Sequence, residues 1–146
     1  GDAALGVIGP SQWEPLANYS PDSAKAAGLE WYGLTVKEFV DAYTAAYNAE
    51  PSYHGAGGYA AGLILQRAIE TAGSYETEKV KAALDGMDLL TFFGYIKFDT
   101  SAENHGLQIG HDMVYIQWQK DASGKLVKQV VWPAEGKSAD ALYPAR

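Results

Sequence analysis

The stretch that decides the fold is Tyr53-His54-Gly55-Ala56-Gly57-Gly58-Tyr59-Ala60-Ala61-Gly62, which continues directly into Leu63-Ile64-Leu65-Gln66-Arg67-Ala68-Ile69-Glu70. Its second half has apolar residues at helical spacing, which predicts a helix from about Gly55 to Ala72 that ends at Gly73. Four glycines where a loop enters this helix allow a backbone to come close to another group. Free N–H groups at a helix start favour polar ligands. Together with two tyrosines and a histidine, the stretch therefore predicts a small-molecule contact point.

Two more helices flank this one. Thr35 and Glu38 have the spacing of a capping box and begin a helix that Glu50-Pro51 ends, because a residue before proline avoids the α region. A third helix covers about residues 76–84. On the N-terminal side, residues 5–8 read as the end of a buried strand, and residues 11–33 as an irregular loop pinned by aromatic rings.

The rest of the chain is β-like. Residues 92–99 and 109–119 are rich in aromatic and β-branched side chains, and residues 126–132 return after the turn signal Asp121-Ala122-Ser123-Gly124. The strand at 109–119 is apolar on both faces, which predicts a central strand covered on both sides. After Pro133 the tail has little periodicity and is expected to lie along the surface.

Composition excludes several classes of function. The 146 residues suffice for one domain, and 47% of them are hydrophobic, which disfavours disorder. A net charge of −7 is poorly suited to nucleic acid or anionic membranes, so no nucleic-acid partner is expected. With no cysteine, disulfides and thiolate catalysis are excluded. His105, His111 and Asp112 match no metal-ligand spacing, so we expect no metal and no cofactor. The sequence lacks an initiator Met and a signal peptide, and we expect it to be part of a longer protein.

The order of motifs resembles the C-terminal part of the type I periplasmic solute-binding proteins of ABC importers, the branched-chain amino-acid (leucine/isoleucine/valine) binding proteins. The resemblance covers nearly the whole chain, although less than half of a complete family member. The motifs that carry it are Gly9-Pro10-Ser11-Gln12-Trp13, the helix 35–48 followed by Tyr53-His54-Gly55-Ala56-Gly57-Gly58-Tyr59-Ala60-Ala61, Gly94-Tyr95-Ile96-Lys97-Phe98-Asp99, Val114-Tyr115-Ile116-Gln117-Trp118 and Val130-Val131-Trp132-Pro133.

This resemblance implies an α/β fold: the C-terminal fragment of a two-lobe type I periplasmic-binding-protein fold, with helices on a mainly parallel sheet and a C-terminal β-hairpin. Residues 1–9 would form a crossover or hinge strand, and residues 10–104 part of the N-terminal lobe. Residues 105–146 would form the last crossover, the hairpin and the C-terminal tail of the other lobe. The family's N-terminal portion, which supplies most groups that hold a substrate's α-carboxylate and α-ammonium, would be missing.

The resemblance also implies ligand-binding residues. Tyr53 and His54 stand where family members often place a pocket residue, and Trp13 stands close to a crossover. The structural alternatives are that Tyr53 packs in the core, His54 caps the helix, and Trp13 anchors a loop.

The function implied by the family is the extracytoplasmic, periplasmic solute-binding component of an ABC importer. It would capture a small amino-acid-like or aromatic-acid solute and dock on a membrane permease, without being an enzyme. A sensory or regulatory module of the same fold is an alternative. A less favoured one is an esterase, since residues 54–58 resemble an oxyanion-hole loop but no Gly-x-Ser-x-Gly elbow exists. Exposed strand edges of an incomplete sheet predict a homodimer.

Overall fold

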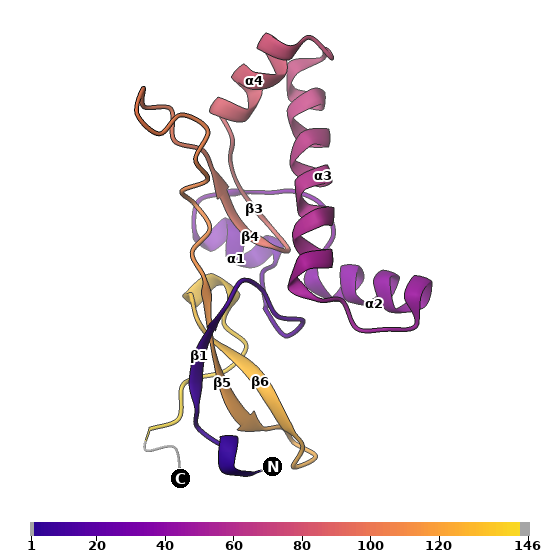
Figure 1. Cartoon of the computed structure of the whole chain (residues 1–146), viewed down its shortest axis with the longest axis vertical. Helices are drawn as coiled ribbons and strands as arrows, with labels where there is room; N and C mark the ends of the chain where they lie inside the picture. Colours follow the sequence, from indigo (N-terminus) through magenta and orange to yellow (C-terminus); the bar gives the residue numbers. More distant parts are fainter. Residues whose placement is uncertain (1, 144–146) are drawn as a thin grey trace.

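The computed structural model describes residues 2–143, and within them the chain forms four α-helices and two three-stranded sheets (Figure 1). Gly1 and residues 144–146, at the ends of the expected hinge segment and tail, lie outside the described residues. The elements are η1 (Asp2–Ala4), β1 (Ile8–Ser11), α1 (Pro21–Ala26), β2 (Glu30–Trp31), α2 (Val36–Tyr47), α3 (Tyr53–Ala72), α4 (Thr77–Asp85), β3 (Asp88–Thr91), β4 (Gly94–Lys97), β5 (Val114–Lys120), β6 (Leu126–Trp132) and η2 (Ala134–Gly136).

The three long helices form where local signals place them. At α2, the Thr35 hydroxyl accepts the N–H of Glu38 at 3.3 Å, and the Glu38 carboxylate accepts the N–H of Thr35 at 2.8 Å, which confirms the capping box. Helix α3 begins at Tyr53, two residues before the expected start, because the Ser52 hydroxyl caps it by accepting the N–H of Gly55. Gly73 ends α3 in the left-handed conformation with φ of 56°, as expected.

The segment 11–33 is less irregular than expected, because it holds α1 and β2. Helix α1 has six residues, which are too few to show a periodic pattern of apolar residues. Its formation depends on the groups that cap its N-terminus. Ser20 and Ser23 exchange hydrogen bonds there, and Pro21 occupies the first helical position, where a missing N–H costs nothing.

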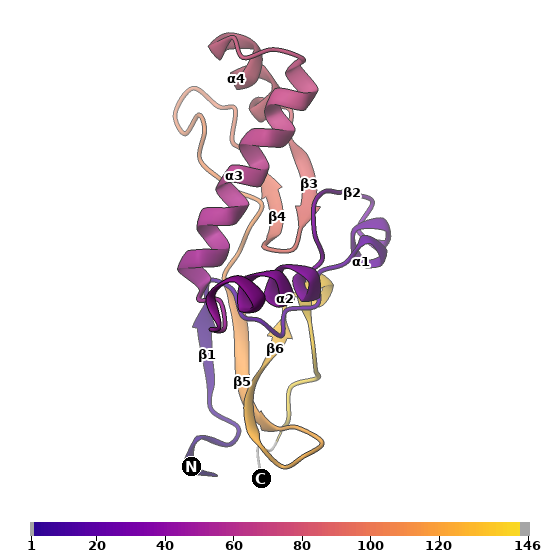
Figure 2. The ribbon, with the colours of Figure 1, turned by 90° about the vertical axis from the view of Figure 1, so that its right-hand side faces the viewer.

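The two sheets occupy different ends of the molecule, with the helices gathered around β2, β3 and β4 and the strands β1, β5 and β6 extending away from them (Figure 2). One sheet has the order β2-β3-β4 and the other β1-β5-β6. The hairpin expected from β5 to β6 is confirmed, with Gln117 opposite Gln129.

The expectation of a mainly parallel sheet is wrong. Only β2 and β3 pair in parallel, through Glu30 with Leu89 and Trp31 with Leu90, and the other pairings among the described strands are antiparallel. The connections explain this. Residues 92–93 join β3 to β4 and residues 121–125 join β5 to β6, and such short loops permit only antiparallel neighbours. The connection from β2 to β3 contains α2, α3 and α4 and is long enough for a parallel crossover.

The main hydrophobic core lies where the two sheets meet. It joins Leu90 and Phe92 of the first sheet and its turn to Val114, Ile116 and Val130 of the second. Three aromatic rings fill its centre: Trp13 is 1% exposed and meets Phe39 and Phe92 edge-on, with ring centroids 5.8 and 6.0 Å away. The two sheets are therefore held together by one shared core.

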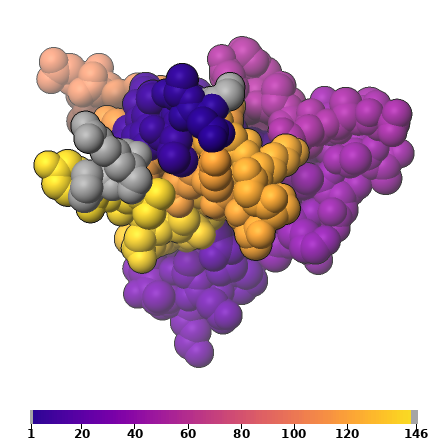
Figure 3. Space-filling model, turned by 90° about the horizontal axis from the view of Figure 1, so that it is seen from below, coloured from indigo at the N-terminus to yellow at the C-terminus, as the bar shows by residue number. Residues whose placement is uncertain are grey.

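Strand β5 is central in its sheet, as expected, but only one of its faces is mainly apolar, with Val114 and Ile116 buried and Trp118 half-buried. On the other face Tyr115 is 46% exposed, while Gln117 and Gln119 are buried under the tail. The Gln117 side chain accepts the N–H of Leu142 at 2.7 Å and donates to the carbonyl of Leu142 at 3.1 Å. Gln119 donates to the carbonyl of Asp140 at 2.8 Å. The tail thus lies along the sheet, held by side-chain amides, and Figure 3 shows it (yellow) beside the hairpin (orange).

Candidate functional site

Tyr53 and His54 form the first turn of α3 and lie at the surface. Tyr53 is 43% exposed, and the two rings stack with centroids 4.0 Å apart and planes 29° from parallel. Ser52 occupies the N–H of Gly55, so the N–H groups of Tyr53 and His54 remain at the open end of the helix. The structure therefore brings together two of the three expected site residues, beside a helix N-terminus.

The glycines of α3 lie inside the helix rather than in a loop before it, because Ser52 starts the helix early. Two of them do allow a close approach, but to protein rings. A Cβ at Gly55 would lie 3.3 Å from the Tyr43 ring, and one at Gly57 would lie 3.5 Å from Phe93. At Gly58, a Cβ would meet nothing within 4 Å among the described residues.

Trp13 occupies a different environment. Its side chain is buried in the core, and its indole N–H donates to the carbonyl of Phe92 at 2.9 Å. The structure thus separates Trp13 from the exposed pair formed by Tyr53 and His54, and gives it the packing and anchoring contacts of a core residue.

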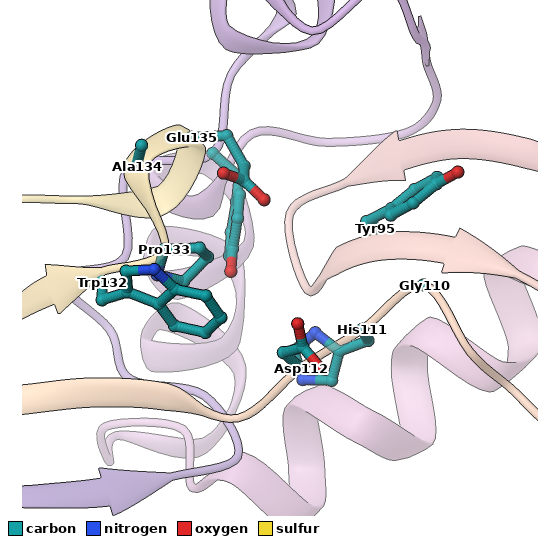
Figure 4. Close-up of a pocket in the computed structure, with 9 residues that line it drawn as sticks. Tyr95, Gly110, His111, Asp112, Trp132, Pro133, Ala134 and Glu135 are labelled. Carbon is teal, nitrogen blue, oxygen red and sulfur yellow. The ribbon is translucent and has the colours of Figure 1, made fainter.

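A second feature, which the sequence did not indicate, is a cavity of about 190 Å³ where the two sheets meet (Figure 4). It lies between β4, the segment before β5, and the corner from β6 into η2. Its lining is largely aromatic and acidic: Tyr19, Tyr95, Gly110, His111, Asp112, Trp132, Pro133, Ala134 and Glu135. These residues come from segments far apart in the sequence, so no local sequence motif indicates the cavity.

The protonation of two cavity residues follows from their surroundings. His111 Nε2 lies 2.9 Å from the carbonyl oxygen of Gln12, which can only accept, so this nitrogen carries the proton. Burial lowers the pKa of His111, which keeps the imidazole neutral at pH 7. Burial also raises the pKa of Tyr19, and the negative charges of Glu135 and Asp112 raise it further, so the phenol stays protonated. The charge of the cavity at neutral pH is therefore that of its carboxylates.

The histidines considered for metal binding lie in separate places. His105 contacts the Asp85 carboxylate of α4 at 3.0 Å, whereas His111 lines the cavity. Within residues 2–143, no group of three or more His, Cys, Asp or Glu side chains is placed to hold a metal ion. None of the described helices combines the length and hydropathy needed to cross a bilayer.

Comparison with known proteins defines the class to which this fold belongs. A family model described as periplasmic binding protein matches residues 1–125, and the chain belongs to this family, in its type I class. The crystal structure of a leucine binding protein, LivK of Thermotoga maritima, is similar, with 25% sequence identity and a TM-score of 0.55. The match covers 89% of this chain and 31% of the other, so the chain spans about a third of that protein's length.

These findings confirm the resemblance and the α/β fold class, with the chain corresponding to part of the type I fold. The family and the similar structure are both binding proteins rather than enzymes. A solute-binding role therefore agrees with the family, the fold and the exposed helix entrance.

Proposed function

We propose that this chain is part of the extracytoplasmic solute-binding component of an ABC importer, which captures a small amino-acid-like or aromatic-acid solute in the periplasm and delivers it to a membrane permease. The observation that carries the proposal is the exposed, stacked Tyr53–His54 pair at the start of α3, in a chain of the periplasmic binding protein family. The similarity to a leucine binding protein supports an amino-acid-like solute.

The chemistry of the α3 entrance suits such a solute. The free N–H groups of the first helical turn and the helix dipole favour a carboxylate, and the faces of Tyr53 and His54 offer oriented apolar surface to a side chain. No bond has to be made or broken, so these groups need only complement the bound solute. Trp13, at 1% exposure, would influence binding through Phe39 and Phe92 rather than by contact in this conformation.

The lobe assignment is part of the same proposal. Residues 1–9 would enter from a hinge, residues 10–104 would belong mainly to one lobe, and residues 105–146 would return through the last crossover to the other. The antiparallel pairing of β1 with β5 supports this, because Ser11 lies opposite Val114, which packs in the core with Phe39 of α2 where the chain passes between the helical part and the hairpin.

The first test is a solute screen with a Tyr53 variant. A thermal-shift screen of the full-length protein against amino acids and aromatic acids is expected to give a raised melting temperature with one class, since a ligand of the native state stabilises it by mass action. Tyr53→Ala is expected to weaken the affinity for that solute about tenfold, because an aromatic contact worth roughly 1.5 kcal/mol is lost.

Tyr75→Ala is the matched control, because Tyr75 is 87% exposed and lies beyond the other end of α3. It should leave solute affinity unchanged. Unchanged affinity in both Tyr53→Ala and His54→Ala would contradict the placement of the solute at the α3 entrance.

We also propose that two copies associate through sheet edges. Strand β1 pairs only with β5 among the described strands, and beside its outer edge Val7 and Ile8 are 53% and 54% exposed. An exposed apolar strand edge is a template for pairing with another chain. Sedimentation is expected to show a dimer at micromolar concentration that Ile8→Lys dissociates, and a wild-type monomer under these conditions would contradict the proposal.

A further inference from the structure

The cavity where the sheets meet contains a polar group without a partner. Tyr19 is 3% exposed, and its hydroxyl makes no hydrogen bond within residues 2–143, although the residue lines the cavity. Its ring is fixed by Gly136, where an added Cβ would lie 2.5 Å from a ring carbon. Among the described residues no fully buried side-chain oxygen or nitrogen lacks a partner, so this hydroxyl is open to the cavity, where its oxygen can accept a hydrogen bond from a bound group.

Two carboxylates lining the cavity also lack counter-ions. Asp112 and Glu135 take part in none of the nine ion pairs found among the described residues. The lysines nearest to them in sequence are already engaged: Lys120 pairs with Asp2 at 2.8 Å, and Lys137 with Asp140 at 2.7 Å. With His111 neutral, the cavity carries a net negative charge that no described cation balances.

Aromatic rings form the remaining walls. Figure 4 shows the carboxyl groups of Glu135 and Asp112 on two sides of the space, with the rings of Trp132 and Tyr95 on the other two. The Tyr95 hydroxyl donates to Asp88 at 2.7 Å, which fixes the position of that ring. Aromatic faces beside carboxylates attract organic cations through the ring quadrupole as well as through charge.

The geometry points to a binding site for a small primary organic ammonium ion, whose N–H groups donate to the Asp112 and Glu135 carboxylates and to the Tyr19 hydroxyl oxygen while its alkyl part contacts Trp132. A volume of about 190 Å³ limits the ligand to a small molecule, since pockets for drug-sized ligands begin at about 300 Å³. This site is separate from Tyr53 and His54 and does not rest on the proposed function.

The experiment is a titration of the full-length protein with n-butylammonium chloride, followed by the NMR signal of the Trp132 indole N–H and by calorimetry. A saturable shift of that signal is expected. Asp112→Asn and Glu135→Gln are each expected to weaken binding about tenfold, the size of one charge interaction at a partly exposed site. Tyr19→Phe should weaken binding of butylammonium but not of tetramethylammonium, which has no N–H to donate.

Glu103→Gln is the matched control. It removes the same charge from an exposed loop and should bind butylammonium like the unaltered protein. Tyr53→Ala should also leave this affinity unchanged, so the two proposed sites can fail independently. Circular dichroism of each variant checks that the fold is kept. The proposal is overturned by the absence of a saturable shift, by an equal response to potassium chloride, or by unchanged affinity when Asp112 and Glu135 are neutralised.

Discussion

Replacing Trp13 with alanine is expected to lower the free energy of unfolding by about 3–5 kcal/mol, the usual cost of deleting a large aromatic side chain from a core. Trp13 is 1% exposed and lies between Phe39 of α2 and Phe92 of the β3–β4 turn. Its removal leaves a cavity where the two sheets share their core. Urea unfolding followed by far-ultraviolet circular dichroism measures the loss.

Two further variants separate packing from hydrogen bonding. Trp13→Phe retains most of the ring but removes the N–H that donates to Phe92, so we expect a smaller loss of about 1–3 kcal/mol. Trp132→Ala serves as the control, because Trp132 is 43% exposed and its loss should cost much less. Equal stability of Trp13→Ala and the unaltered protein would show that Trp13 is not the centre of the core.

Replacing Gly94 with alanine is expected to lower the free energy of unfolding by about 2–6 kcal/mol, from backbone strain and overpacking of roughly 1–3 kcal/mol each. Gly94 follows the Phe92–Phe93 turn with φ of 129°, which side chains other than glycine rarely adopt. An added Cβ would also collide with the His111 ring, which is held by the carbonyl of Gln12. The change should therefore also disturb the cavity that His111 lines.

Gly58→Ala is the matched control for Gly94→Ala. Gly58 lies within α3 with open space around it, so alanine there should stabilise the protein by about 0.5–1 kcal/mol through its better helix propensity. Opposite signs for the two glycine variants in urea unfolding would confirm both local conformations. A neutral effect of Gly94→Ala would contradict the left-handed geometry of the turn.

The helices could be predicted from sequence because their signals are local. Thr35 and Glu38 cap α2 through neighbouring groups, and Gly73 ends α3 through its own conformational freedom. The sequence pattern places the glycines after Tyr53 in a loop, because nothing in it shows that Ser52 begins the helix ahead of them. The direction of the strands differs from the prediction, because the short connections at residues 92–93 and 121–125 make these neighbours antiparallel, whereas the family resemblance implies a mainly parallel sheet.

The candidate site could be predicted only in part. Tyr53 and His54 are adjacent in sequence, so the sequence alone predicts that they lie together at the start of a helix. The role of Trp13 depends on the residues that pack around it, which the sequence does not show. The cavity cannot be predicted from the sequence, because the residues that line it come together only in the tertiary structure; they include Tyr19, Tyr95, Asp112 and Glu135. Taken alone, each of these residue types is common at a protein surface or in a core, so none of them indicates a site.

The glutamines beneath the tail have a consequence for how that segment can vary. A glutamine amide offers the same donor and acceptor as a peptide unit, and Gln117 uses both on the main chain of Leu142, while Gln119 bonds the main chain at Asp140. Because these hydrogen bonds are made to the main chain, they do not depend on which side chains the tail carries. Substitutions at residues 140–142 should therefore keep the tail on the sheet as long as Gln117 and Gln119 are present, except proline at position 142, which has no N–H to donate.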